Sequence, residues 1–285
     1  MQKRQILKLL PILVLIVSSC GSNSETASDS DSLAGDSIQM DTVKAQIKEF
    51  VHIFPSHLKV ALMFKNAGLK YEPSLLLPAA NSSKYVTTYD RAFALGFYGV
   101  DMAYTAINNQ TQSSINLLKV SKGLSQQLGL ESVYESNKYV EKFEANLNNI
   151  DSLSYIIGDL FGETDAFLKD NDKLDVTLLS FAGGWTESVY LAASLAKSTN
   201  NKAIIELVGD QLISLPPLLK LLGENQKNFA LEPLIKQLTE VKAVLEAGIV
   251  KPETETEPMV FELDSKKLDE LLNKLNSIRS KVTNI

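Results

Sequence analysis

The sequence predicts an all-α protein, formed as a single multi-helix bundle of about nine or ten helices. Amphipathic segments with helical spacing follow one another from about residue 42 to the end of the 285-residue chain. Short polar turns and helix-ending residues separate these segments. Only Met259–Leu263 alternates apolar and polar residues as a strand does. Because this stretch is only five residues long, we expect a loop there.

Local signals place each helix in order. Asp41 can cap a helix from about Thr42, Pro55 suits the first position of the next helix, and Gly68 suits the position just past its end. The later helices are expected near residues 87–108, 112–128, 132–147, 151–169, 174–197, 202–222, 231–247 and 265–282. Pro216 and Pro217 are expected to disturb the segment 202–222.

The C-terminal segment 264–285 is predicted to be an amphipathic helix. Its apolar residues fall at spacings of 3, 4, 3 and 4, which is the heptad seam of a helix–helix contact; they are Leu268, Leu271, Leu275, Ile278 and Val282. Since the seam is little over two heptads long, we expect it to dock on the bundle of its own chain. A partner helix or a second copy of the chain is the alternative.

The N-terminus predicts a lipid anchor. Residues 1–19 have the layout of a secretory signal, with three basic residues ahead of the uninterrupted apolar run Leu9–Val17, which is too short to span a bilayer. The signal ends in "VSSC", which resembles the lipobox of bacterial lipoproteins and predicts lipidation of Cys20. The alternative is an ordinary cleaved signal, in which Cys20 is only the small residue that ends the signal and carries no lipid.

Cys20 is the only cysteine, and acylation would leave no free thiol for a disulfide or for thiolate catalysis. Residues 20–41 are Ser/Asp-rich and lack apolar periodicity, so they are expected to form a flexible acidic tether with a reach of roughly 25 Å. The helical body, residues 42–285, would then lie close to a membrane of the bacterial cell envelope. We expect this membrane to be the outer membrane, and the body to lie on either its periplasmic or its surface face.

The charge balance excludes several partners. The net charge is −6, and removal of residues 1–19 would take away three basic and no acidic residues, which leaves −9. An acidic protein without basic clusters lacks the surplus of Lys and Arg side chains that neutralises phosphates. We therefore expect no nucleic-acid partner and no adsorption to anionic lipids; the membrane contact is expected through the lipid on Cys20.

Recognisable catalytic and metal motifs are absent from the sequence. The histidines, His52 and His57, are five residues apart, without a zinc spacing, and no G-x-S-x-G turn accompanies them. We therefore predict neither a metal nor a cofactor. Four glycines are read as places where helices approach closely; they are Gly158, Gly162, Gly183 and Gly184.

A faint internal repeat links two segments. An offset of 86 residues places Leu95–Ala106 over Phe181–Ala192 and pairs Asp101 with Glu187 and Tyr104 with Tyr190. A polar turn and a further helix follow each copy. The pattern predicts two related helical hairpins, and chance similarity between amphipathic helices is the alternative.

Three stretches carry a family resemblance: "FPSHLKVALMFKNAG", "LGFYGVDMAYTAINNQTQSSINLLKVSKGLSQQLG" and "DSLSYIIGDLFGETDAFLKDND" with the following "FAGGWTESVYLAASL". They resemble a family of uncharacterised helical lipoproteins of Bacteroidetes, and the likeness extends from about Phe54 to Leu195, which is about half of the chain. The resemblance implies an envelope location and an all-α fold. It brings no catalytic residues with it.

The function must therefore be inferred from the residues. If the repeat is real, its two faces can line one cleft whose candidate ligand-binding residues are Asp101, Tyr104, Trp185, Glu187 and Tyr190. Aromatic rings with carboxylates suit a sugar, a peptide or a cationic ligand. We predict a non-enzymatic binding or interaction module for an envelope protein, peptide or glycan. Two alternatives are a hydrolase, for example of glycosides, that uses paired carboxylates, and a purely structural pattern of core aromatics and solvated acids.

Overall fold

The computed structural model describes residues 57–136, 138–146, 149–170, 173–225, 230–250 and 260–284, all within one compact unit, Asp41–Ile285. The predicted signal, Cys20, the tether, the first predicted helix, Pro55 and His52 lie outside the described residues. Among the described helices, none has both the length and the apolar character that crossing a membrane requires.

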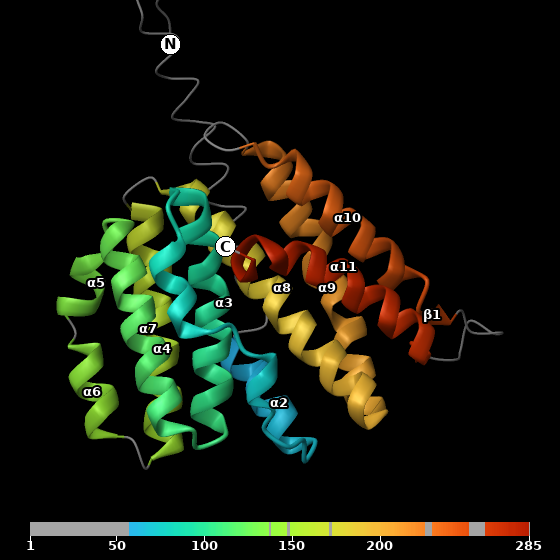
Figure 1. The fold of residues 1–285 in the computed structure, drawn as a ribbon, viewed down its shortest axis with the longest axis horizontal. Coiled ribbons are helices and arrows are strands. Elements are labelled where there is room, and N and C mark those ends of the chain that lie inside the picture. Colours follow the sequence, from blue (N-terminus) through green and yellow to red (C-terminus); the bar gives the residue numbers. More distant parts are fainter. Residues whose placement is uncertain are drawn as a thin grey trace, which may run out of the picture. The chain divides into compact units, whose positions relative to one another are not determined.

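The all-α prediction is confirmed (Figure 1). The described residues form ten α-helices: α2 (His57–Asn66), α3 (Thr88–Ile107), α4 (Thr111–Gln127), α5 (Glu131–Ser136), α6 (Tyr139–Ala145), α7 (Ile150–Asp170), α8 (Leu174–Thr199), α9 (Lys202–Glu224), α10 (Glu232–Glu246) and α11 (Ser265–Thr283). Two short 3-10 helices, η1 (Pro73–Leu75) and η2 (Ala79–Lys84), lie between α2 and α3.

Local features at the helix ends explain where α2 ends and where α3 begins. Gly68 follows α2 with a φ of +71°, a left-handed conformation that glycine adopts without steric cost. At the start of α3, the Thr87 hydroxyl accepts a hydrogen bond from the Asp90 N–H at 3.0 Å, and the Asp90 carboxylate accepts one from the Thr87 N–H at 3.4 Å. This capping box satisfies backbone donors that the helix itself leaves unpaired.

Three expectations need correction. The predicted helix 132–147 is divided into α5 and α6, because Lys138 adopts a left-handed φ of 49° that a right-handed helix cannot contain. The expected loop around residue 260 contains a two-residue strand, β2 (Val260–Phe261), which pairs with β1 (Ile249–Val250) in antiparallel fashion. Helix α9 runs through Pro216 and Pro217 without interruption.

The helices form two successive sets with the same pattern of neighbours. In the first set, α3 packs on α4 and α7, and the pair α5 and α6 packs on both α4 and α7. In the second set, α8 packs on α9 and α11, and α10 packs on both α9 and α11. The predicted pair of related hairpins, α3–α4 and α8–α9, is thus part of two four-membered sets, in which α5 and α6 together take the place of one helix.

The two sets meet where α3 crosses α8, the most extensive helix contact of the described residues. A Cβ atom on Gly96 would lie 2.0 Å from the Ser180 carbonyl oxygen, and one on Gly183 would lie 2.1 Å from the Phe93 carbonyl oxygen. The close approach predicted at Gly183 is therefore confirmed. The same prediction is wrong for Gly158 and Gly162, which lie on the exposed side of α7 with nothing within 4 Å of an added Cβ.

The predicted docking of the C-terminal helix on its own chain is also confirmed. The seam residues of α11 are all buried against α8 and α10; they are Leu268, Leu271, Leu275, Ile278 and Val282. Asp264 caps this helix by accepting a hydrogen bond from the Lys267 N–H at 2.8 Å. The docked helix brings its last turns to the crossing of α3 and α8.

Candidate functional site

The two acids paired by the internal repeat meet at the helix crossing. Asp101 of α3 and Glu187 of α8 lie about one turn beyond the close approach of the glycines, close enough for the charge of Glu187 to act on Asp101. Both residues have an exposed fraction of 0%. The alternative in which these acids are solvated is therefore wrong.

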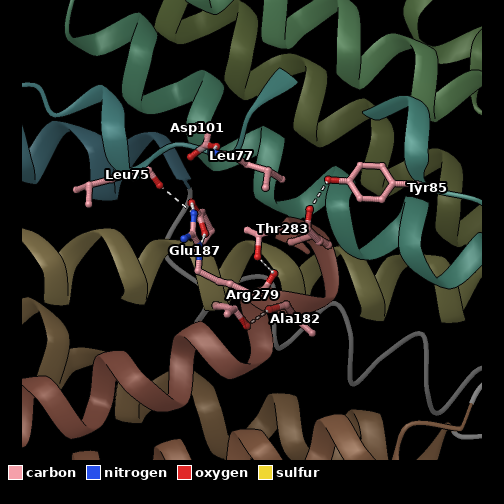
Figure 2. Close-up of polar contacts among 10 residues, drawn as sticks. Leu75, Leu77, Tyr85, Asp101, Ala182, Glu187, Arg279 and Thr283 are labelled. Carbon is pink, nitrogen blue, oxygen red and sulfur yellow. Dashed lines mark hydrogen bonds and ion pairs between the residues drawn. The ribbon is translucent and has the colours of Figure 1, made fainter. Parts of the chain in front are cut away.

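A third charged residue comes from α11. Arg279 donates from Nε to Glu187 Oε2 at 2.6 Å and from Nη2 to Glu187 Oε1 at 2.8 Å, which is a bidentate ion pair (Figure 2). Its Nη2 also donates to the Leu75 carbonyl oxygen at 2.9 Å. The guanidinium carbon lies 3.6 Å from the centre of the Tyr190 ring, so the charge rests on an aromatic face.

The chain between α2 and α3, residues 69–87, is bound to this cluster and is called the connecting segment below. The Leu77 N–H donates to Asp101 Oδ2 at 2.8 Å. The Tyr98 hydroxyl donates to the Pro78 carbonyl at 2.9 Å, and the Tyr85 hydroxyl donates to the Val282 carbonyl at 3.0 Å. Burial raises the pKa of Tyr85 to about 12, so its hydroxyl keeps its proton. Helices α3 and α11 thereby hold the segment in place.

The surroundings of Asp101 favour its protonated form. Its Oδ1 has no hydrogen-bond partner among the described residues, and the charge of Glu187 acts on its carboxyl. Burial raises the pKa of Asp101 well above its usual range, and the negative charge of Glu187 raises it further. Burial also raises the pKa of Glu187, and the Arg279 guanidinium opposes that rise. A neutral Asp101 beside the ion pair of Glu187 and Arg279 leaves the buried cluster without net charge.

The predicted aromatic residues do not all join the cluster. Tyr190 is half-buried beneath Arg279. Trp185 is fully buried and donates from Nε1 to Ser214 Oγ of α9 at 3.2 Å. Tyr104 is also buried, packs edge-on against Phe64 of α2, and accepts a hydrogen bond from the Glu72 N–H at 3.1 Å. The structure thus brings together Asp101, Glu187 and Tyr190, while the rings of Trp185 and Tyr104 pack elsewhere in the core.

Arg279 is the residue that sequence reasoning missed. Two signals could have found it. The chain uses three arginines against 25 lysines, so each arginine marks a place where a planar, bidentate donor can be required. Arg279 also lies four residues after Leu275 of the apolar seam, where a charge must find a partner if the helix docks.

Among the surface grooves that the described residues form, one in each helix set lies between the third and last members of that set. The α6–α7 groove has a volume of about 450 Å3 and is lined by Lys142, Asn146, Asp151, Ser152, Tyr155, Ile156 and Asp159. The α10–α11 groove has a volume of about 520 Å3, and its lining includes Gln237, Glu240, Asp269, Lys274 and Ser277. None of the five predicted ligand-binding residues lines either groove, so their role as ligand contacts stays a prediction.

The two grooves differ in how far their polar groups are already paired. In the α10–α11 groove, Lys274 pairs with Glu240 at 3.3 Å, Gln237 donates to Ser277 Oγ at 3.0 Å, and Asp269 pairs with Lys197 of α8. In the α6–α7 groove, Asp151 has no hydrogen bond or ion pair to another described side chain, and Tyr155 is 74% exposed. The α6–α7 groove is therefore the better prepared for a ligand.

Within the described residues, no group of three or more His, Cys, Asp or Glu side chains is placed to hold a metal ion. Comparisons with protein-family models, with curated proteins and with solved structures found no match to this chain. The resemblance to helical lipoproteins of Bacteroidetes stays a prediction, and function is argued from the residues alone.

Proposed function

We propose that this chain is a lipid-anchored protein of the bacterial cell envelope that acts by binding rather than by catalysis. Cys20 carries the lipid, and residues 20–41 tether the helical body to the membrane. The sequence supports this reading through the signal-like head, the small residues before the sole cysteine and the acidic linker. The partner is an envelope protein, peptide or glycan.

The observation that supports binding over hydrolysis is the state of the paired carboxylates. Asp101 and Glu187 are both 0% exposed, and Arg279 donates to both carboxylate oxygens of Glu187. A glycoside hydrolase instead holds its carboxyl groups about 5–9 Å apart, on either side of the bond that it cleaves. Because both acids are closed off from solvent and Glu187 is already paired with Arg279, a substrate cannot reach them, so they serve to hold α3, α8 and α11 together.

The proposal is tested by anchoring and partner capture in intact cells. Metabolic labelling with a fatty acid should mark the wild-type chain and fail with Cys20→Ala, which should also leave the membrane fraction. Mild cross-linking should recover a defined envelope partner with the wild-type chain, and purified protein should bind that partner without releasing a product. Labelling of the Cys20→Ala variant would refute the anchor, and turnover that is lost with Glu187→Gln would restore the hydrolase alternative.

A further inference from the structure

Tyr155 occupies a position that folding does not explain. Helix α7 is amphipathic, and it buries Leu153, Ile157 and Leu160 while Tyr155 faces solvent with 74% of its surface exposed. Every other aromatic residue whose side-chain environment the structure describes is buried or half-buried. A large exposed ring on the polar side of a helix contributes no core packing, and such rings are enriched where proteins bind ligands.

The groove beside Tyr155 is polar and partly ordered in advance. Buried Tyr139 donates its hydroxyl proton to Asp159 Oδ2 at 2.8 Å, and the Lys142 ammonium lies 5.3 Å from the centre of the Tyr139 ring. These contacts fix one carboxylate and one cation at the groove before any ligand arrives. The volume of about 450 Å3 lies within the range of small-molecule sites, about 300–1,000 Å3.

The lining selects among ligand classes. An apolar ligand or a protein surface would need an apolar centre, and Ile156 is the only aliphatic residue of the lining. Two carboxylates, Asp151 and Asp159, oppose an anion. The Lys142 ammonium opposes a cationic ligand, and the Asp159 carboxylate that would attract one already accepts a hydrogen bond from Tyr139. A neutral ligand with many hydroxyl groups matches all of these groups, because a hydroxyl can donate to the carboxylates and accept from the ammonium or an amide.

From this geometry we infer that the α6–α7 groove is a glycan-binding site, in which the apolar face of one sugar ring stacks on Tyr155. The hydroxyl groups of that sugar bind Asp151, Ser152 and Asn146 at the rim. The inference rests on the proposed binding function and gives it a ligand class. The α10–α11 groove has the equivalent place in the second helix set but lacks an aromatic residue in its lining, and it serves as an internal control.

The test uses the full chain, purified in detergent, and an array of neutral oligosaccharides of glucose, mannose, galactose, xylose and N-acetylglucosamine. The best binder is then titrated by calorimetry. Tyr155→Ala should weaken binding at least about tenfold, as truncation of a central aromatic contact does. Tyr155→Phe keeps the ring and should stay within about threefold of the wild-type affinity.

Two matched controls separate this site from general surface effects. Ile213→Ala removes another exposed apolar side chain, on α9, and Lys274→Ala alters the α10–α11 groove. Both should leave glycan affinity unchanged, and all four variants should unfold at the wild-type temperature because the altered side chains lie at the surface.

Three outcomes would overturn the inference. Absence of binding across the array would refute the glycan class, whereas recovery of a protein partner by cross-linking in cells would still support the proposed function. Glycan binding that survives Tyr155→Ala would place the site elsewhere on the chain. Binding of charged peptides in place of glycans, with loss in Tyr155→Ala, would keep the groove and reject its ligand class.

Discussion

At the residue scale, Asp101 shows how a buried acid can hold helices together without a charge. Its Oδ2 accepts a hydrogen bond from the Leu77 N–H at 2.8 Å, and the charge of Glu187 acts on its carboxyl. An ionised Asp101 would place a second negative charge beside Glu187 in a fully buried site, where repulsion and desolvation are both costly. We therefore expect Asp101 to keep its proton in the folded protein, which makes the stability of the protein depend on pH.

The sign of that dependence follows from the raised pKa of Asp101. In the unfolded chain an aspartate titrates at about 3.9, whereas the folded chain keeps this proton to higher pH. The contribution of Asp101 to stability is therefore fully present below about pH 3.9, and it declines as the pH rises toward the folded pKa. An asparagine offers a donor and an acceptor in the same places and has no proton to lose.

We therefore expect Asp101→Asn to be at least as stable as the wild type at pH 7, and to lose less free energy of unfolding between pH 4 and pH 7. Urea unfolding at several pH values measures both quantities. Asp151→Asn, at an exposed position of α7, is the matched control and should keep the wild-type pH dependence. A loss of more than about 2 kcal/mol at pH 7 in Asp101→Asn, typical of a broken buried network, would show that Asp101 is folded as a carboxylate.

At the element scale, the crossing of α3 and α8 depends on glycines that no side chain can replace. A Cβ on Gly183 would overlap the Phe93 carbonyl oxygen, which belongs to the backbone of a buried helix and cannot rotate away. Gly158 of α7 is also helical, but its added Cβ would meet nothing within 4 Å. Replacement of glycine by alanine should therefore have opposite effects on stability in the two helices.

Gly183→Ala is expected to cost several kcal/mol of unfolding free energy, because the helices must separate and the buried contacts around the crossing loosen. Gly158→Ala should stabilise the protein by about 0.5–1 kcal/mol, the usual preference for alanine in an exposed helix. Thermal unfolding followed by circular dichroism measures both. A tolerated Gly183→Ala would mean that α3 and α8 can shift apart at little cost.

Helix bounds could be predicted from the sequence because their causes are local, as the capping box at Thr87 and the left-handed Gly68 illustrate. The break at Lys138 could not, since lysine gives no local signal for a left-handed conformation. The sequence paired Asp101 with Glu187 through the repeat. It did not reveal Arg279, because 92 residues separate it from Glu187 and only the docking of α11 brings the two together.

At the scale of the whole molecule, the contacts that the two helix sets share predict that the sets unfold together. Helix α8 of the second set packs on α3 of the first in the most extensive helix contact of the described residues. Helix α11 also reaches the connecting segment, where the Val282 carbonyl accepts hydrogen bonds from Asn81 and from Tyr85. Unfolding of either set would therefore expose the buried Asp101–Glu187–Arg279 cluster, so neither set is expected to persist alone.

The lone tryptophan makes this cooperativity measurable. Trp185 is fully buried on α8 and bonds to Ser214 of α9, so its fluorescence reports on the second set. Leu118 lies on α4 of the first set with 1% of its surface exposed, and Leu118→Ala should cost about 2–5 kcal/mol. If the sets unfold together, this change will move the guanidinium midpoint of Trp185 fluorescence as far as the midpoint of the far-ultraviolet circular dichroism. A fluorescence midpoint that stays at the wild-type value while the dichroism divides into two transitions would show that the sets unfold separately, and that the contacts around α3 and α8 are weaker than their burial indicates.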